Sequence, residues 1–424
     1  MSWLNRHPHL RDQDLELLDF EPHPNEIFII SFPARPHKSN SDSGSNTEHI
    51  TTPRTNRKVI AGESDLEQWL TQLSGNSPEH GVSTNGTSGD PSTINLILAS
   101  QMSSLDELPF TKNAYRAIMS HMKMHGSIVR AINRNTSCNV SSLPCSWPCG
   151  DSTAPSITGS WEGDMALSVT FFPNTLTTNA VWYGLDMKEH RTYGHSLTNA
   201  DIITSRLANF DGKCLHPLIL PTVFAEFERE RHVALVRKYS TQLVQRIHDL
   251  AYPDLHQSKE TETISSKPSS KRPSRDYDLT KKLKALLPNF QRGFETEKAA
   301  AAEHNPSVSE TSHRARCVER KKEPEPAVVL WQNTSFLSNG LRNWQTQLRK
   351  MLLQVQELDD TNFGIDTIDR NAQVELKLAR LREVGGRIET KVQDLIDEYD
   401  EHIRQCNHIT EGLRLATQLV SERL

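Results

Sequence analysis

The last hundred residues carry an apolar repeat of helical period that one small compact domain cannot accommodate. Large apolar residues recur every three or four positions, so they line one face of an α-helix. A helix over residues 368–424 would extend about 85 Å at 1.5 Å per residue. Such a helix is expected to serve as a stalk, a coiled-coil arm or an oligomer interface. The stripe consists of Leu381, Val384, Ile388, Val392, Leu395, Tyr399, Ile403, Cys406, Ile409, Leu413 and Val420.

A second helical repeat precedes this one. The segment Asn362-Phe363-Gly364 interrupts the periodicity between them and predicts a break, so we expect two antiparallel helices. Gly385 and Gly386 weaken the second helix by roughly 1 kcal/mol each relative to alanine. The apolar positions of the first helix are Leu337, Leu341, Trp344, Leu348, Met351, Val355 and Leu358.

The first half of the chain alternates strand-like and helix-like patterns. Apolar runs at 26–32 and 94–99 are typical of buried strands, and runs at 165–172 and 180–185 predict a hairpin. Thr111 is placed to cap a helix, because apolar residues follow it at helical spacing. Those residues are Tyr115, Ile118, Met119 and Met122.

These patterns predict an α+β chain: an α/β domain with a mixed sheet, followed by a long antiparallel helical stalk. We expect the α/β domain over residues 1–255, ending in a long helix that begins near Pro221. A disordered charged linker is expected over 256–327, and the stalk over 328–424. Within the linker, 279–287 has leucines at helical spacing, and we interpret it as a transient or docking helix rather than a membrane anchor.

Composition excludes several classes of protein. The chain is 35% hydrophobic with a net charge of -5, and its apolar stretches fall short of the roughly 20 residues that span a bilayer. The acidic first thirty residues do not form a secretory signal, so a cytoplasmic location with reduced cysteines is expected. No basic stripe with interleaved aromatics is present, so nucleic acid is not an expected partner.

Motifs for catalysis are missing, and we expect no enzyme activity. The chain has no HExxH, P-loop, GxGxxG or paired CxxC motif. Gly150-Asp151-Ser152 is similar to the start of a GDS-type hydrolase block, but we interpret it as a turn. Cys138, Cys145 and Cys149 lack the spacing of a zinc module.

One acidic group on the long helix has the spacing of a metal site. Asp394, Glu398 and His402 stand at i, i+4 and i+8 and share a helix face, beside an acidic pair of Asp397 and Glu401. Oxygen ligands of this kind bind Mg²⁺ loosely through water. The alternative, which we favour, is the solvated polar face of an amphipathic helix.

Several blocks resemble one known family. The segments LHPLILPTVFAEFERERHVALV (215–236), LWQNTSFLSNGLRNWQTQLRKML (330–352) and IDEYDEHIRQCNHITEGLRLATQL (396–419) are similar to fungal CorA-like divalent-cation transporters. The segments 125–132 and 167–185 are similar to that family too. The resemblance implies an α/β cytosolic domain that feeds a long stalk helix into the first of two membrane spans. It also implies a pentamer that conducts Mg²⁺ or similar ions, with a Gly-Met-Asn signature at the end of the first span.

The chain departs from this family at the pore. It contains no Gly-Met-Asn and ends at Leu424 before any span, so this chain alone is not expected to conduct ions. We therefore expect a regulatory cytosolic part of a magnesium transporter, either a shortened paralogue or an incomplete gene product. It would assemble through the long helix with itself or with full-length relatives, and so associate with the membrane through partners. The alternative is a cytosolic coiled-coil adaptor that docks partner helices through residues 331–424.

Overall fold

The computed structural model describes a set of segments that form two compact units. Unit 1 combines Met1–Ala234 with Ser338–Arg404, and unit 2 combines Leu235–Leu337 with Gln405–Leu424. The unit boundaries pass through the long helices, so the units cut across the three zones expected from composition. The described residues are 10, 12–23, 26–33, 56–75, 93–100, 105–133, 139–147, 150–158, 165–187, 190–192, 195–209, 216–251, 327–365 and 372–421.

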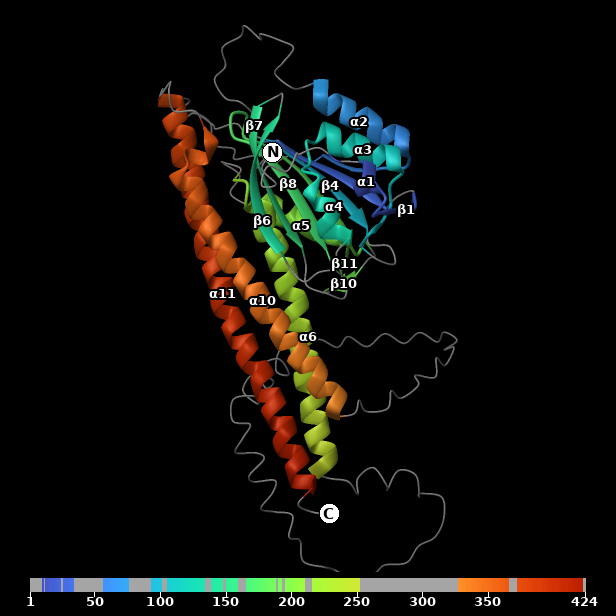
Figure 1. The fold of residues 1–424 in the computed structure, drawn as a ribbon, viewed down its shortest axis with the longest axis vertical. Coiled ribbons are helices and arrows are strands. Elements are labelled where there is room, and N and C mark those ends of the chain that lie inside the picture. Colours follow the sequence, from blue (N-terminus) through green and yellow to red (C-terminus); the bar gives the residue numbers. More distant parts are fainter. Residues whose placement is uncertain are drawn as a thin grey trace, which may run out of the picture. The chain divides into compact units, whose positions relative to one another are not determined.

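Unit 1 is built on a seven-stranded sheet of order β3-β2-β4-β9-β8-β7-β6 (Figure 1). The pair β4 and β9 is parallel, whereas all its other neighbouring pairs are antiparallel. The mixed helix-and-sheet fold and the mixed sheet are therefore as expected, compatible with α+β. The strands are β2 (Ile27–Pro33), β3 (Asn56–Val59), β4 (Thr93–Ser100), β6 (Asn139–Trp147), β7 (Gly150–Thr158), β8 (Ala166–Phe172) and β9 (Thr177–Leu185).

The apolar runs in the sequence predict four of these strands. β2, β4, β8 and β9 coincide with them, and β8 pairs with β9 as the expected hairpin, with Phe172 opposite Thr177. The hairpin of β6 and β7 was missed, because its serine-rich and proline-containing strands lack an apolar run. The expected turn at Gly150-Asp151-Ser152 is wrong: these residues begin β7, and Gly150 lies opposite Trp147.

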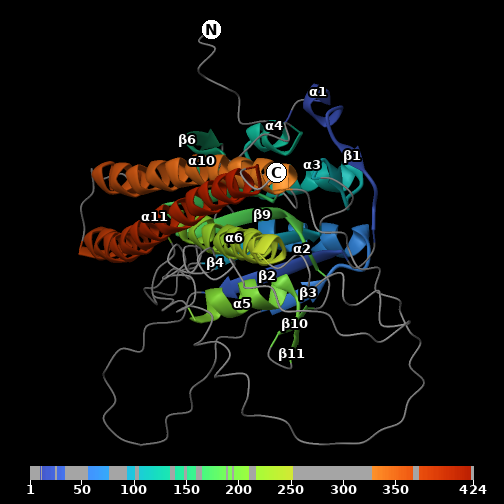
Figure 2. The ribbon, with the colours of Figure 1, turned by 90° about the horizontal axis from the view of Figure 1, so that it is seen from below.

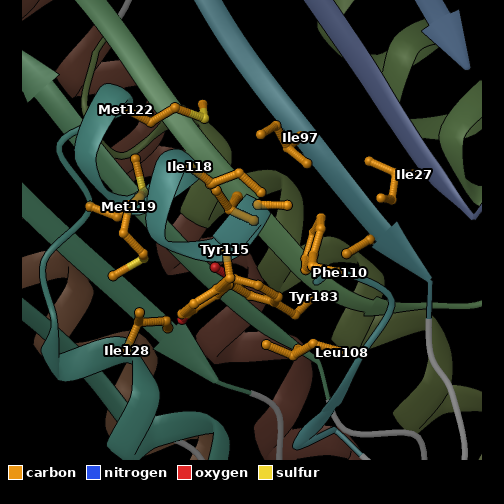
Figure 3. Packing of buried hydrophobic residues seen from close by; sticks show 14 of the residues in the cluster. Ile27, Ile97, Leu108, Phe110, Tyr115, Ile118, Met119, Met122, Ile128 and Tyr183 are labelled. Carbon is orange, nitrogen blue, oxygen red and sulfur yellow. The ribbon is translucent and has the colours of Figure 1, made fainter. Parts of the chain in front are cut away.

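Four helices pack on one face of the sheet and contribute to the main apolar core. Figure 3 shows buried side chains of this core. Tyr115 and Tyr183 lie at its centre, and both are fully buried. Thr111 caps α3 as expected, because its Oγ1 accepts a hydrogen bond of 3.0 Å from the Ala114 amide. The helices are α1 (Asp12–Leu15), α2 (Glu63–Gly75), α3 (Lys112–His121) and α4 (Ser127–Asn133).

Helices α6 (Ile219–Ala251) and α10 (Ala327–Asp360) provide side chains to a second core in unit 1. The ring of Trp182 on β9 packs against Phe224 and Phe227 of α6, at centroid distances of 5.2 and 5.5 Å. Phe224 also packs against Trp344 of α10. Because helices bury both faces, the central strands are continuous apolar runs.

The C-terminal helix pair has the apolar faces that the periodicity predicts. Every stripe residue of α10 is buried, as is every residue of the stripe on α11 (Ala372–Ser421) from Leu381 to Leu413. The expected break is confirmed: Asn362, Phe363 and Gly364 have φ angles of 51°, 58° and 72°. The expected start near residue 368 lies outside the described residues.

Contacts between α10 and α11 in unit 1 follow one register. The side-chain nitrogen of Gln345 lies 2.9 Å from the carbonyl oxygen of Ile396. Further along, Gln356 donates to Glu389 at 3.1 Å. As the residue number rises on α10, its partner's number falls on α11. The three helices α6, α10 and α11 lie side by side within this unit (Figures 1 and 2).

Unit 2 has a smaller core of its own. Leu243 of α6, Leu330 of α10, and Ile409 and Leu413 of α11 are buried together. The described part of the chain contains no helix with the length and apolarity that crossing a bilayer requires. The expected linker, up to residue 326, and its segment 279–287 lie outside the described residues. The remaining described elements are β1 (Asp19–Phe20), β5 (Glu107–Leu108), β10 (His190–Thr192), β11 (His195–Leu197) and α5 (Asn199–Asn209).

Candidate functional site

The three predicted metal ligands share one side of α11 in unit 1 but differ in environment. Asp394 is exposed, Glu398 is partly buried, and His402 is buried. The Nε2 atom of His402 lies 3.4 Å from a carboxylate oxygen of Glu398. The three residues share a helix face, as the spacing predicts. Which groups this face can bind depends on the contacts of Glu398.

A guanidinium group from α6 binds the central carboxylate. Nε and Nη2 of Arg229 donate hydrogen bonds of 2.5 and 2.6 Å to the two carboxylate oxygens of Glu398. These hydrogen bonds lower the pKa of Glu398 and raise the pKa of Arg229. Bidentate pairs of this kind are among the stronger polar interactions in proteins. The cation paired with Glu398 is therefore an arginine of the same chain.

A buried polar cluster lies beside this ion pair. Nδ1 of His232 is 2.7 Å from the hydroxyl oxygen of Tyr399, so α6 and α11 are joined a second time. Burial is the main cause that lowers the pKa of His232, and the charges of Arg231 and His402 lower it further. Burial likewise raises the pKa of Tyr399. Both rings are therefore neutral near pH 7.

Glu228 supplies the charge within this cluster. It is fully buried, accepts a hydrogen bond of 2.7 Å from Arg231 and lies 3.6 Å from Nε2 of His232. The ring of Trp344 on α10 stands edge-on to His232 at 6.2 Å. Residues of α6 and α11 thus form one polar cluster, against which a ring of α10 packs. We name Glu228, Arg229, His232, Glu398 and Tyr399 the helix clamp.

Further polar contacts support the clamp. Gln345 of α10 donates to Asp400 of α11 at 2.7 Å. The amide of Val140, on the edge strand β6, donates to Gln347 of α10 at 3.2 Å. Lys391 forms an ion pair with Glu226 at 3.0 Å. These bonds fix the three helices against one another and against the sheet within unit 1.

The described residues do not bring a metal-ligand set together. Within the segments that the structure describes, no group of three or more His, Cys, Asp or Glu side chains is arranged to hold a metal ion. Asp394 is exposed to solvent, and Arg229 engages Glu398. Glu398 joins α11 to α6 through Arg229. Asp394 is exposed, Glu398 is partly buried and His402 is buried, so this polar face of α11 is only partly solvated.

The other candidate residues lie in the sheet. Ser152 is buried within β7 opposite Cys145 of β6, and it does not stand at a strand-to-helix turn. Burial raises the pKa of the Cys145 thiol to about 11. Cys138 and Cys149 lie outside the described residues.

Sequence reasoning missed most of the clamp, although one signal for it was present. The sequence predicts an apolar face on α6 that includes Val223, Phe224, Phe227, Leu235 and Leu243, and Glu228 and His232 stand at i and i+4 in its gap between Phe227 and Leu235. The spacing on α6 allows i,i+3 ion pairs of Glu226 with Arg229 and of Glu228 with Arg231. The second of these is formed. Arg229 binds Glu398 on another helix instead of Glu226.

Comparison with protein-family models and with curated proteins finds no match for this chain.

Proposed function

We propose that this chain is the cytoplasmic part of a CorA-like divalent-cation transporter assembly, and that it acts by associating with membrane-spanning relatives. In this proposal Mg²⁺ is the ion that the assembly transports. In the same proposal, Glu398 serves to join two helices through its hydrogen bonds with Arg229. The chain has a regulatory role and no enzyme activity.

One observation carries the proposal: a mixed-sheet domain is followed by a helix of 50 residues, α11, whose apolar stripe continues along its length. The resemblance implies this order of elements. Gln345 contacts Ile396 and Gln356 contacts Glu389, so the residue numbers rise along α10 as they fall along α11. These contacts support an antiparallel stalk. The clamp supports it further, because it fixes α11 to α6.

The proposal places the association on the polar face of α11. The stripe of α11 is buried against the chain's own side chains, so it is not available to another subunit. Exposed residues such as Asp394, Asp397 and Glu401 remain for contact with a second copy or with a relative. Mg²⁺ held loosely through water between such acidic faces would reduce their repulsion.

Capture from cross-linked membranes tests this proposal. The tagged chain is expressed in its own source cells, cross-linked, and purified from detergent extracts for mass spectrometry. We expect enrichment of a protein with two apolar segments of about 20 residues and a Gly-Met-Asn signature. Recovery of partners that all lack such segments would contradict the proposal.

A matched pair of variants links the result to the clamp. Arg229→Ala with Glu398→Ala removes the ion pair between α6 and α11, and we expect weaker capture of the transporter. Glu411→Ala with Arg414→Ala removes an exposed pair within α11 and serves as the control. Sedimentation velocity with and without millimolar Mg²⁺ measures self-association, and a strictly monomeric chain would exclude the homo-oligomer.

A cytosolic adaptor is the second candidate, and the start of α10 favours it. Val328, Trp331 and Phe336 are exposed there, which is typical of a surface that another helix covers. In the same capture experiment, an adaptor would recover soluble helical partners from the cytosolic fraction and no transporter.

A further inference from the structure

A pocket of about 240 Å³ lies in unit 1, between α1 and the C-terminal end of α3. If each non-hydrogen atom takes the roughly 30 Å³ that a water molecule occupies in the liquid, the pocket holds a ligand of about eight such atoms. It is therefore a site for a small molecule. Its apolar lining consists of Leu10, Leu15, Met119 and Met124, and its polar lining consists of Asp12, Arg116, Ser120 and Lys123.

One of the lining residues, Lys123, stands at a backbone position that glycine usually occupies. It follows Met122, the C-cap of α3, and has a φ of 56°. The Met124 amide donates a hydrogen bond of 3.0 Å to the Met119 carbonyl, which is the Schellman ending of a helix. A side chain is unfavourable in this left-handed conformation, whereas glycine adopts it freely. The Thr170 hydroxyl donates to the Lys123 carbonyl at 2.8 Å and so fixes the turn.

The helix dipole does not account for a lysine at this particular position. A positive charge near the end of a helix offsets the partial negative charge of the last carbonyl groups. That benefit is available throughout the last turn, where the backbone is right-handed and unstrained. Position 123 adds the pocket, because Lys123 lines it together with Arg116 and Ser120.

The contacts of Arg116 show which anion this lining accepts. Oδ1 of Asp12 accepts a hydrogen bond of 2.7 Å from Nη2 of Arg116. The Asp12 side chain is 85% exposed, so the pair is weak and another carboxylate can replace it. Two cations and one carboxylate line the pocket, which gives the lining a net charge of +1. The pocket therefore favours an anion.

The apolar lining requires an apolar body on the same ligand. Leu15, Met119 and Met124 are buried, and methionine side chains adapt their shape to what packs against them. Acetate or inorganic phosphate would carry the charge but would leave this lining uncovered. An alkyl chain would cover it, and each methylene group that leaves water tightens binding about fourfold.

We propose that this pocket binds a monocarboxylate with an alkyl body of about six carbons. Its carboxylate pairs with Arg116 and Lys123, and its chain packs on Leu15, Met119 and Met124. Hexanoate has eight non-hydrogen atoms and matches the volume. The proposal is independent of any transporter role, because it concerns only the pocket beside α3.

Calorimetric titration of the full chain with acetate, butanoate, hexanoate and decanoate tests the ligand class. We expect a dissociation constant for hexanoate at or below about 1 mM. Affinity should rise about fourfold per methylene group from butanoate to hexanoate and level off before decanoate, because the pocket is then full. Acetate or inorganic phosphate that binds as tightly as hexanoate would overturn the proposal, because charge alone would then explain binding.

Lys123→Gly separates binding from folding. It removes the ammonium group and relieves the backbone, so the midpoint of thermal unfolding should not fall, while the affinity for hexanoate should drop about tenfold. Asp12→Asn should tighten binding several-fold, because the competing carboxylate is gone. Lys112→Ala is the matched control: Lys112 lies on α3, pairs with Glu16 at 3.6 Å and does not line the pocket.

Nuclear magnetic resonance of ¹³C-methyl-labelled methionines locates the ligand. Hexanoate should shift the methyl signals of Met119 and Met124 and leave that of Met351, which is buried on α10, unchanged. Three further outcomes would overturn the proposal. They are no binding of hexanoate at concentrations up to about 10 mM, unchanged affinity in Lys123→Gly, and binding that leaves both Met119 and Met124 unshifted.

Discussion

Arg229 on α6 and Glu398 on α11 form a bidentate ion pair with hydrogen bonds of 2.5 and 2.6 Å. The two residues are far apart in the sequence. Each also has a residue of opposite charge or a histidine within four positions on its own helix, Glu226 for Arg229 and His402 for Glu398. Both carboxylate oxygens of Glu398 accept a hydrogen bond from the guanidinium group of Arg229. In this structure Glu398 therefore joins α11 to α6, and the metal site at Asp394, Glu398 and His402 stays a prediction.

The first prediction concerns the strength of this pair. In a double-mutant cycle of Arg229→Ala and Glu398→Ala, we expect a coupling free energy of about 1 kcal/mol, because both side chains are about a third exposed. Urea unfolding measures it. The same cycle on Glu411 and Arg414, which pair within one helix, should give no measurable coupling.

The coupling should also depend on pH. Hydrogen bonds from Arg229 lower the pKa of Glu398 below its ordinary value of 4.5. The contribution of Glu398 is therefore fully present above pH 4.5 and is lost as the pH falls through the lowered pKa of the folded state. A coupling energy that is the same at pH 7 and pH 2.5 would contradict this account.

The second prediction concerns His216, whose ring is buried against Phe363 at a centroid distance of 5.3 Å. Burial lowers the pKa of His216 to about 3 from 6.5. The unfolded chain therefore binds a proton below pH 6.5 that the folded chain does not bind. We expect stability to fall by up to about 1.4 kcal/mol per pH unit between pH 6.5 and pH 3 from this residue.

His216→Asn separates titration from hydrogen bonding. Nδ1 of His216 accepts from the Leu218 amide at 3.1 Å, and an asparagine side chain makes the same bond two residues on. The variant should lose stability at pH 7.5 through weaker packing, but its pH dependence should be shallower. His121→Asn, on the exposed side of α3, is the control. An unchanged slope in His216→Asn would show that other groups cause the pH dependence.

The third prediction concerns glycines in and between the C-terminal helices. A Cβ atom at Gly386 would meet nothing within 4 Å, so Gly386→Ala should stabilise the protein by about 1 kcal/mol. Gly364 has a φ of 72°, a conformation that costs alanine about 1 kcal/mol or more, so Gly364→Ala should destabilise. In thermal unfolding, the midpoint temperature should rise for Gly386→Ala and fall for Gly364→Ala. Equal shifts for the two variants would contradict the positive φ angle at Gly364.

The fourth prediction concerns the cap of α3. Thr111→Ala removes the acceptor for the Ala114 amide and a hydrogen bond of 2.5 Å to Glu63, and it should cost about 1 kcal/mol. Thr111→Ser keeps the hydroxyl and should be nearly neutral. Urea unfolding compares the two. If serine destabilises as much as alanine, packing of the methyl group matters more than the cap.

The local patterns in the sequence predicted much of the fold. Periodicity alone identified the buried faces of α10 and α11, since burial on a helix repeats every 3.6 residues wherever the partner lies. The break at Phe363, the cap at Thr111 and the hairpin of β8 and β9 were also predicted, because capping and turn formation involve residues close in sequence. The hairpin of β6 and β7 has no such local signal.

The sequence by itself determined which side chains of α11 must be buried and that Asp394, Glu398 and His402 share one side of it. Only the tertiary structure decided that Arg229 would bind Glu398 and that His232 would meet Tyr399. The reason is physical: a helix fixes its own spacing through bonds four residues apart, whereas the partner of a carboxylate depends on which other helix packs beside it. The sequence contains Glu228 and His232 within the apolar face of α6, but it does not identify the residues that they contact.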